Sequence, residues 1–146
     1  MKVQISRIDK DLPLPKFETA GAVGFDLISR LDTTIPSKKL AFIPSNNIIK
    51  VPEGHALIIV PRSSMPRKTG LSFPHSIGVI DQDYCGDKDE LLIQVQNMTD
   101  HEVVVKRGER IAQGLFIKIE KADWEEVDSI QISNRGGFGS TGNRVK

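Results

Sequence analysis

The chain has 146 residues, with 20 lysines and arginines, 19 aspartates and glutamates, and a formal net charge of +1. The length suits one domain, and the lack of a basic excess argues against a nucleic-acid duplex or an anionic membrane as a partner. Cys85 is the only cysteine, so an intrachain disulfide is impossible and a Cys/His zinc site is not expected. The single thiol, and the absence of an apolar run of signal-peptide or membrane-span length, predict an intracellular protein.

Short runs of β-branched or alternating apolar residues recur between turn residues, and they predict strands. In chain order the expected strands cover residues 3–8, 55–60, 77–80, 91–96, 102–106 and 115–119. The 12 glycines and 8 prolines interrupt the chain too often for long helices, and only residues 122–127 are expected to form a helical turn or two. The pattern therefore predicts an all-β fold, a compact barrel or sandwich of short strands.

The composition changes at Asn134, where the chain becomes polar and rich in glycine. A tail of this kind cannot bury apolar surface and is usually disordered. Phe138, standing among glycines and hydroxyl residues, is the feature that argues for a lid instead. We therefore divide the chain into a β domain over residues 1–133 and a lid or tail over residues 134–146.

Five polar clusters flanked by glycine could carry chemistry. They cover residues 20–27, 61–65, 78–86, 107–113 and 135–142. Each cluster alone is weak, because glycines and aspartates are common in ordinary turns. Together they suit a phosphate ester: Arg62 and Arg135 supply bidentate charge, Asp81 supplies a base, and Phe138 supplies a stacking face. Neither a P-loop nor a Rossmann motif is present, so loops on a β scaffold would hold the phosphate.

In this order the five clusters resemble the five motifs of the trimeric dUTPase family. Residues 20–27 read Ala-Gly-Ala-Val-Gly-Phe-Asp-Leu, and residues 61–65 contain Arg-Ser-Ser. Residues 78–86 read Gly-Val-Ile-Asp-Gln-Asp-Tyr-Cys-Gly, and residues 108–113 read Gly-Glu-Arg-Ile-Ala-Gln. The last cluster ends in Gly-Phe-Gly-Ser-Thr-Gly. Five ordered motifs over nearly the whole chain are far more specific than any one of them.

The resemblance implies a jelly-roll-like β protomer and a threefold homotrimer with shared active sites. It implies an enzyme that hydrolyses dUTP to dUMP and pyrophosphate with the help of Mg²⁺, supplying dUMP and limiting the dUTP available for DNA synthesis. Asp81 would orient and deprotonate a water that attacks the α-phosphorus. Asp26 would hold the Mg²⁺ through water, with no direct protein ligand.

The resemblance also assigns substrate contacts. Uracil is expected to be read by the hairpin that ends at Asp81, largely through the backbone of Gly78, Val79 and Ile80. Tyr84 is expected to pack on the deoxyribose and exclude a ribose. The phosphate chain would be contacted by Ser63, Ser64 and Gln113, with Arg62 nearby. The tail would close over the uracil ring with Phe138 and over the outer phosphates with Arg135, Gly139, Ser140 and Thr141.

Several positions depart from the family pattern. His75 stands where many members have an asparagine that helps to bind uracil, so either its side chain donates one hydrogen bond or the backbone alone reads the base. Cys85 stands where arginine is common. The final motif is shorter than the frequent Arg-Gly-x-Gly-Gly-Phe form, and residues 87–89 make the following turn unusually charged.

Two alternatives belong to other functional classes. A dCTP deaminase shares this fold and an Arg-Ser-Ser motif, but the Asp-Tyr-x-Gly run and the Phe-Gly-Ser-Thr-Gly tail favour a dUTPase. A catalytically silent nucleotide-binding or regulatory module would be signalled by the loss of Asp81, and Asp81 is present. Release of ammonia rather than pyrophosphate would identify the deaminase.

Overall fold

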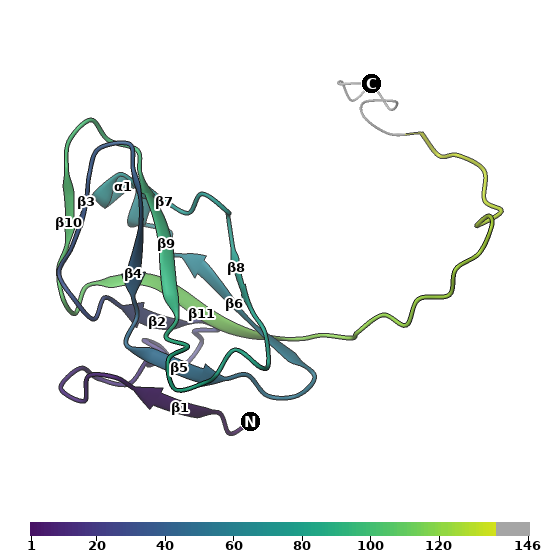
Figure 1. The fold of residues 1–146 in the computed structure, drawn as a ribbon, viewed down its shortest axis with the longest axis horizontal. Coiled ribbons are helices and arrows are strands. Elements are labelled where there is room, and N and C mark those ends of the chain that lie inside the picture. The colour runs from purple at the N-terminus through teal and green to yellow at the C-terminus, as the bar shows by residue number, and fades with distance from the viewer. Residues whose placement is uncertain (137–146) are drawn as a thin grey trace.

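The computed structural model describes residues 1–136, and within them short antiparallel strands dominate (Figure 1). The strands are β1 (Gln4–Arg7), β2 (Phe25–Ile28), β3 (Thr33–Ile35), β4 (Leu40–Pro44), β5 (Asn47–Lys50), β6 (His55–Pro61), β7 (Leu71–Ser72), β8 (Gly78–Ile80), β9 (Leu92–Asn97), β10 (Val103–Val105) and β11 (Arg110–Lys118). A single short helix, α1 (Met65–Thr69), follows β6 in this part of the chain. The prediction of an all-β fold is confirmed, and each of the six expected strands overlaps an observed one.

Two larger sheets carry the fold. One has the strand order β2-β11-β6-β8, and the other has the order β4-β9-β7. Two further strand pairs, β1 with β5 and β3 with β10, complete the structure. All these pairings are antiparallel, and in Figure 1 β11 runs across the direction of β4 and β9.

The core lies between these sheets, and period-two alternation explains which side chains enter it. In β9, Ile93 and Val95 are buried, whereas the side chains between them face outward. They meet Leu27 and Leu57, which are fully buried on the four-stranded sheet. Phe25 on β2 is paired with Gly114 on β11, and its ring leaves no room for a side chain there, because a Cβ atom at Gly114 would lie 2.5 Å from that ring.

Helix α1 was not expected from the sequence. It begins after Ser64, has proline in its first turn, and ends at Gly70, whose φ of 70° is left-handed. The Gly70 N–H donates to the carbonyl of Pro66 at 2.9 Å. The Arg-Ser-Ser segment therefore lies between the end of β6 and the start of α1, where the chain turns away from the sheet.

After Lys118 the chain leaves the β domain and runs outward (Figure 1). The helical turn expected over residues 122–127 is absent, so that prediction was wrong. An isolated turn of this length is unstable without tertiary contacts, and the Trp124 side chain, 90% exposed, makes none that bury it. The boundary between β domain and tail at residue 133 stays a prediction. No helix among residues 1–136 has the length and apolar character needed to cross a membrane.

Candidate active site

Residues of the first, second and fourth motifs meet at one end of the four-stranded sheet. β11 lies between β2 and β6, and Gln113 is opposite both Asp26 on β2 and Val60 on β6. Arg62 follows the end of β6, and Arg110 begins β11. The sheet register therefore brings together four polar side chains that are separated by up to 87 residues of sequence.

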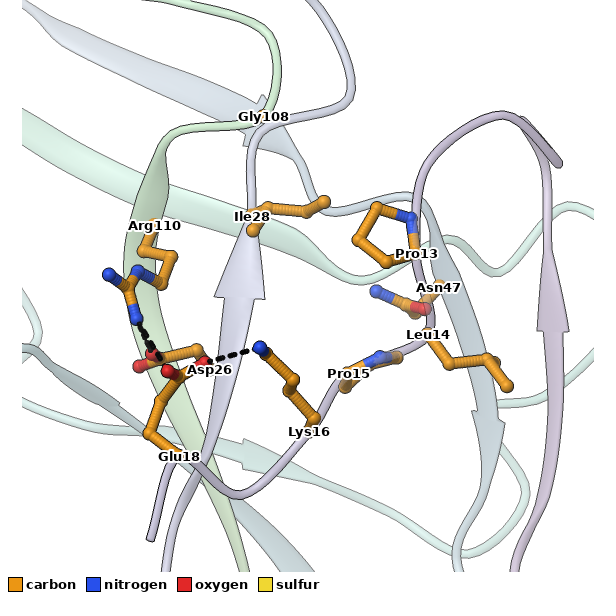
Figure 2. A pocket seen from close by; sticks show the side chains of 10 residues that line it. All are labelled: Pro13, Leu14, Pro15, Lys16, Glu18, Asp26, Ile28, Asn47, Gly108 and Arg110. Carbon is orange, nitrogen blue, oxygen red and sulfur yellow. Dashed lines mark hydrogen bonds and ion pairs between the residues drawn. The ribbon is translucent and has the colours of Figure 1, made fainter.

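Asp26 is the centre of this cluster. Its side chain is only 4% exposed, and its two oxygens lie 3.2 Å from Arg62 Nε and 3.2 Å from Arg110 Nη1. Arg110 also contacts the Glu18 carboxylate at 3.2 Å (Figure 2). A buried carboxylate needs such partners, because an unpaired buried charge is costly. Asp26 thus holds two guanidinium groups in place, although its Oδ1 accepts no hydrogen bond among the described residues.

Two cavities open on either side of Arg110. One, of about 290 Å³, is lined by Asp26, Lys16 and Glu18 among others (Figure 2). The other, of about 340 Å³, is lined by Arg62 and Ser64 at the start of α1. Ser63 is exposed beside them. The end of the sheet therefore presents guanidinium and hydroxyl donors to solvent, which is the donor set that suits a phosphate chain.

Asp81 lies at the opposite end of the same sheet. It follows β8, whose last residue Ile80 pairs with Leu57 near the start of β6. Arg62 follows the other end of β6, five residues beyond Leu57. At the rise of an extended strand this separates Asp81 from Arg62 by about 20 Å. One protomer alone therefore does not bring the expected base to the expected phosphate-binding residues.

β8 is one of the two edge strands of its sheet and precedes Asp81 directly. Gly78, Val79 and Ile80 pair with β6 on one side only, so their outward backbone groups have no strand partner within residues 1–136. The preceding turn has Ser76 at a φ of 65° and stacks the His75 ring on Phe73, with centroids 5.8 Å apart. Backbone donors and acceptors at a sheet edge can read the edge of a flat base.

The loop over residues 81–90 carries Tyr84 and is tied down at both ends. Near its start Gln82 Nε2 donates to the His55 carbonyl at 3.0 Å. At its end Glu90 is buried and accepts two hydrogen bonds from Arg30, at 2.9 and 2.8 Å. The Glu90 bond raises the pKa of Arg30, which therefore stays charged. The Tyr84 side chain is 39% exposed, so its ring can still receive a ligand.

The tail residues are placed only in part. Arg135 is exposed on the segment that leaves the β domain. Phe138, Gly139, Ser140 and Thr141 lie outside the described residues. The sequence alone did not indicate a role for Arg110, Arg30 or Glu90. Arg110 stood within a recognised cluster, whereas the pairing of Arg30 with Glu90 spans 60 residues and leaves no local signal.

Comparison with known proteins agrees with these motifs. The family model described as dUTPase matches residues 10–142. The deoxyuridine 5'-triphosphate nucleotidohydrolases of Dictyoglomus turgidum and Finegoldia magna are 38% and 37% identical to the chain, and each alignment covers 97% of this chain and 99% of the relative.

Solved structures agree as well. A dUTPase from Streptococcus mutans is 36% identical, with a TM-score of 0.76 over 82% of this chain and 98% of its own. The Staphylococcus bacteriophage 80alpha dUTPase, solved with dUpNHpp, shares the fold at 22% identity, with a TM-score of 0.84 over 97% of this chain and 98% of its own. The chain therefore belongs to the dUTPase family, whose jelly-roll-like β fold it shares.

Proposed function

We propose that this protein is a dUTP diphosphatase that acts as a homotrimer with shared active sites. Family membership and the Streptococcus mutans structure support the reaction. The observation that carries the shared site is the sheet register, which separates Asp81 from Arg62 by about 20 Å within one chain. A second copy must supply Asp81 to the arginine cluster, and cyclic symmetry repeats that contact around a closed ring.

Exposed apolar side chains support the association. Leu40 and Phe42 on β4 are 54% and 58% exposed, and Leu92 on the paired strand β9 is 50% exposed. The register places Phe42 opposite Gln94 and Pro44 opposite Leu92, so these groups share the outer face of the sheet. Contiguous exposed apolar surface of this kind marks an interface, and the occupant that completes the site is another copy of the chain.

The chemistry needs a base, donors for the phosphates, and exclusion of the wrong nucleotides. The Asp81 carboxylate takes a proton from a water whose oxygen attacks the α-phosphorus. The bond between that phosphorus and the bridging oxygen breaks, and pyrophosphate leaves with the bond's electron pair. Arg62, Ser63, Ser64 and Gln113 hold the phosphate chain, and most of the rate comes from this positioning and charge neutralisation.

The residues present fit a Mg²⁺ ion that arrives on the phosphate chain. Mg²⁺ keeps several waters and prefers phosphate oxygens to an all-protein cage. Asp26 lines the cavity of about 290 Å³ beside Arg110, so its carboxylate can accept a hydrogen bond from a metal-bound water there. When bound, the ion supplies neutralisation of the phosphate charge.

Selectivity follows from the edge strand, the loop and the tail. Backbone groups of Gly78, Val79 and Ile80 read uracil, and a base with another donor pattern leaves some of them unpaired. The Tyr84 ring packs on the deoxyribose. The tail then closes over the bound nucleotide, with Phe138 over the base and with Arg135, Gly139, Ser140 and Thr141 over the outer phosphates.

Pyrophosphate release is expected with dUTP and Mg²⁺, with much slower release from dCTP, dTTP and UTP. Cytosine has a different hydrogen-bond pattern from uracil. The methyl group of thymine is expected to clash with the base site, and the 2′-hydroxyl of ribose with the Tyr84 ring. The assay measures pyrophosphate and ammonia for all four nucleotides, with and without Mg²⁺. Comparable turnover of dCTP or UTP contradicts the proposal, and ammonia from dCTP identifies a deaminase.

Replacing Tyr84 with alanine is expected to lower the ratio of kcat/KM for dUTP to kcat/KM for UTP by about tenfold or more, because the group that excludes the 2′-hydroxyl is gone. The Tyr84 ring is exposed enough to be removed without opening the core. Circular dichroism and thermal melting check the fold. A ratio equal to that of the parent enzyme would place the ribose filter elsewhere.

A further inference from the structure

The ion pair between Arg30 and Glu90 takes no direct part in the proposed hydrolysis. Both Arg30 nitrogens that face Glu90 are engaged, Nε with Oε1 at 2.9 Å and Nη2 with Oε2 at 2.8 Å. The side chains are only 22% and 10% exposed. A bidentate, largely buried pair fixes geometry more tightly than an exposed one.

Glu90 is the last residue of the loop that begins at Asp81, and its surroundings are locked. Its Oε1 also accepts the backbone N–H of Asn46 at 2.7 Å. The next residue, Leu91, donates its N–H to Asn47 at 2.9 Å and accepts one from Ser45 at 3.0 Å. Asn46 itself has a φ of 71°, a conformation that belongs to a tight turn. The loop therefore ends on a rigid support.

Tyr84 reaches that support. Its hydroxyl donates to the backbone carbonyl of Glu90 at 3.2 Å, which is long for an O–H···O bond. The intervening turn closes on itself, because the Gly86 N–H donates to Asp89 Oδ2 at 2.7 Å and the Asp89 N–H donates to the Gly86 carbonyl at 2.9 Å. The position of the Tyr84 hydroxyl therefore depends on the position of the Glu90 carbonyl.

Without a cation beside it, the Glu90 carboxylate would be a buried unpaired charge. The residue would move toward water, and its carbonyl would move with it. The Tyr84 hydroxyl would then lose its partner and the ring its orientation. A misplacement of about 1 Å in a site can cost a large factor in rate.

We propose that Arg30 is a positioning residue for Tyr84, acting through Glu90, and that it thereby sets the discrimination between deoxyribose and ribose. This inference rests on the proposed function, in which Tyr84 packs on the sugar. Arg30 is not proposed to touch a substrate atom. Its contribution appears in the choice between dUTP and UTP.

The first test compares Arg30→Met with Lys106→Met. Lys106 is a matched control, since it also pairs with a carboxylate, Asp32, at 2.9 Å, but the pair is exposed and makes no hydrogen bond to residues 81–90. The ratio of kcat/KM for dUTP to that for UTP is expected to fall about tenfold in Arg30→Met and to stay at the parent value in Lys106→Met. A merely structural role would reduce the active fraction for both substrates alike and leave the ratio unchanged.

Two further variants keep the test interpretable if Arg30→Met folds poorly. Arg30→Lys retains the charge but not the planar fork, so it is expected to recover only part of the ratio. The double variant Arg30→Met with Glu90→Gln removes both charges, and the amide oxygen can still accept the Asn46 N–H. It is expected to fold stably and still show a lowered ratio, because the bidentate support is gone. Thermal melting of every variant checks this.

A double-mutant cycle decides whether Arg30 acts through Tyr84. Tyr84→Phe removes only the hydroxyl and is expected to reproduce the lowered ratio of Arg30→Met. Combining the two is expected to lower the ratio no further. If Arg30→Met and its double variant keep the parent ratio while Tyr84→Ala loses it, the positioning role is overturned and the proposed function stands. If the parent enzyme itself fails to prefer dUTP to UTP, both are overturned.

Discussion

Asp81→Asn is expected to lower kcat for dUTP by about 100-fold or more while the substrate still binds. The amide keeps the shape of the carboxylate but cannot take a proton from the attacking water. Asp81 is exposed at the end of β8, so the substitution leaves the core untouched. Steady-state kinetics give kcat, and binding of a non-hydrolysable dUTP analogue gives the affinity.

Asp83→Asn is the matched control for this experiment. Asp83 is an exposed aspartate in the same loop, two residues further on, and has no role in the proposed chemistry. It is expected to retain a kcat near that of the parent enzyme. An Asp81→Asn enzyme with an unchanged kcat would remove Asp81 from the role of base, even if the protein proves to be a dUTP diphosphatase.

Mixed trimers are expected to recover activity that neither parent has. One parent carries Asp81→Asn, and the other is truncated after Ser133, so it lacks the residues proposed to close over the nucleotide. Each alone is expected to form a folded trimer with little activity. When the two are unfolded and refolded together, a hybrid ring contains a site that combines an intact Asp81 from the truncated chain with an intact tail from the full-length chain.

The control mixture replaces the truncated parent with a truncated chain that also carries Asp81→Asn. Its hybrids hold intact tails but no intact base, so they are expected to stay inactive. Mass spectrometry of the intact assemblies confirms that hybrids have formed. Confirmed hybrids of the first mixture that are as inactive as their parents would mean that base and tail act within one chain, and the shared site would be wrong.

Several strands could be predicted from the sequence because the pattern that indicates them is local. Residues 55–60 and 91–96 became β6 and β9, where β-branched content and alternation dictate a strand with one buried face. Strands β3, β4 and β5 were not among the expected strands. β3 and β5 contain β-branched residues but span only three and four residues. In β4 both Leu40 and Phe42 point outward, so its apolar residues do not alternate with polar ones, and its partner β9 lies about 50 residues away in sequence.

The helix predictions failed for two different reasons. Residues 122–127 have acceptable helix formers, yet no packed surface supports them, and the exposed Trp124 finds no partner in the described part of the chain. Residues 65–69 include Pro66, which discouraged a helix, but proline is tolerated in a first turn and Gly70 supplies the left-handed end. Tertiary context decided the first case, whereas the signals of the second, Pro66 and Gly70, are local.

The sequence by itself determined the family, the all-β class and the set of side chains available for chemistry, because motif order and period-two patterning are properties of the chain. Only the tertiary structure decided how those side chains are grouped. The sheet register joins Asp26, Arg62 and Gln113 and carries Asp81 to the opposite end, and it brings Arg30 to Glu90 across 60 residues. Such contacts depend on which strands pair and in what register, and no local pattern encodes a pairing between distant segments.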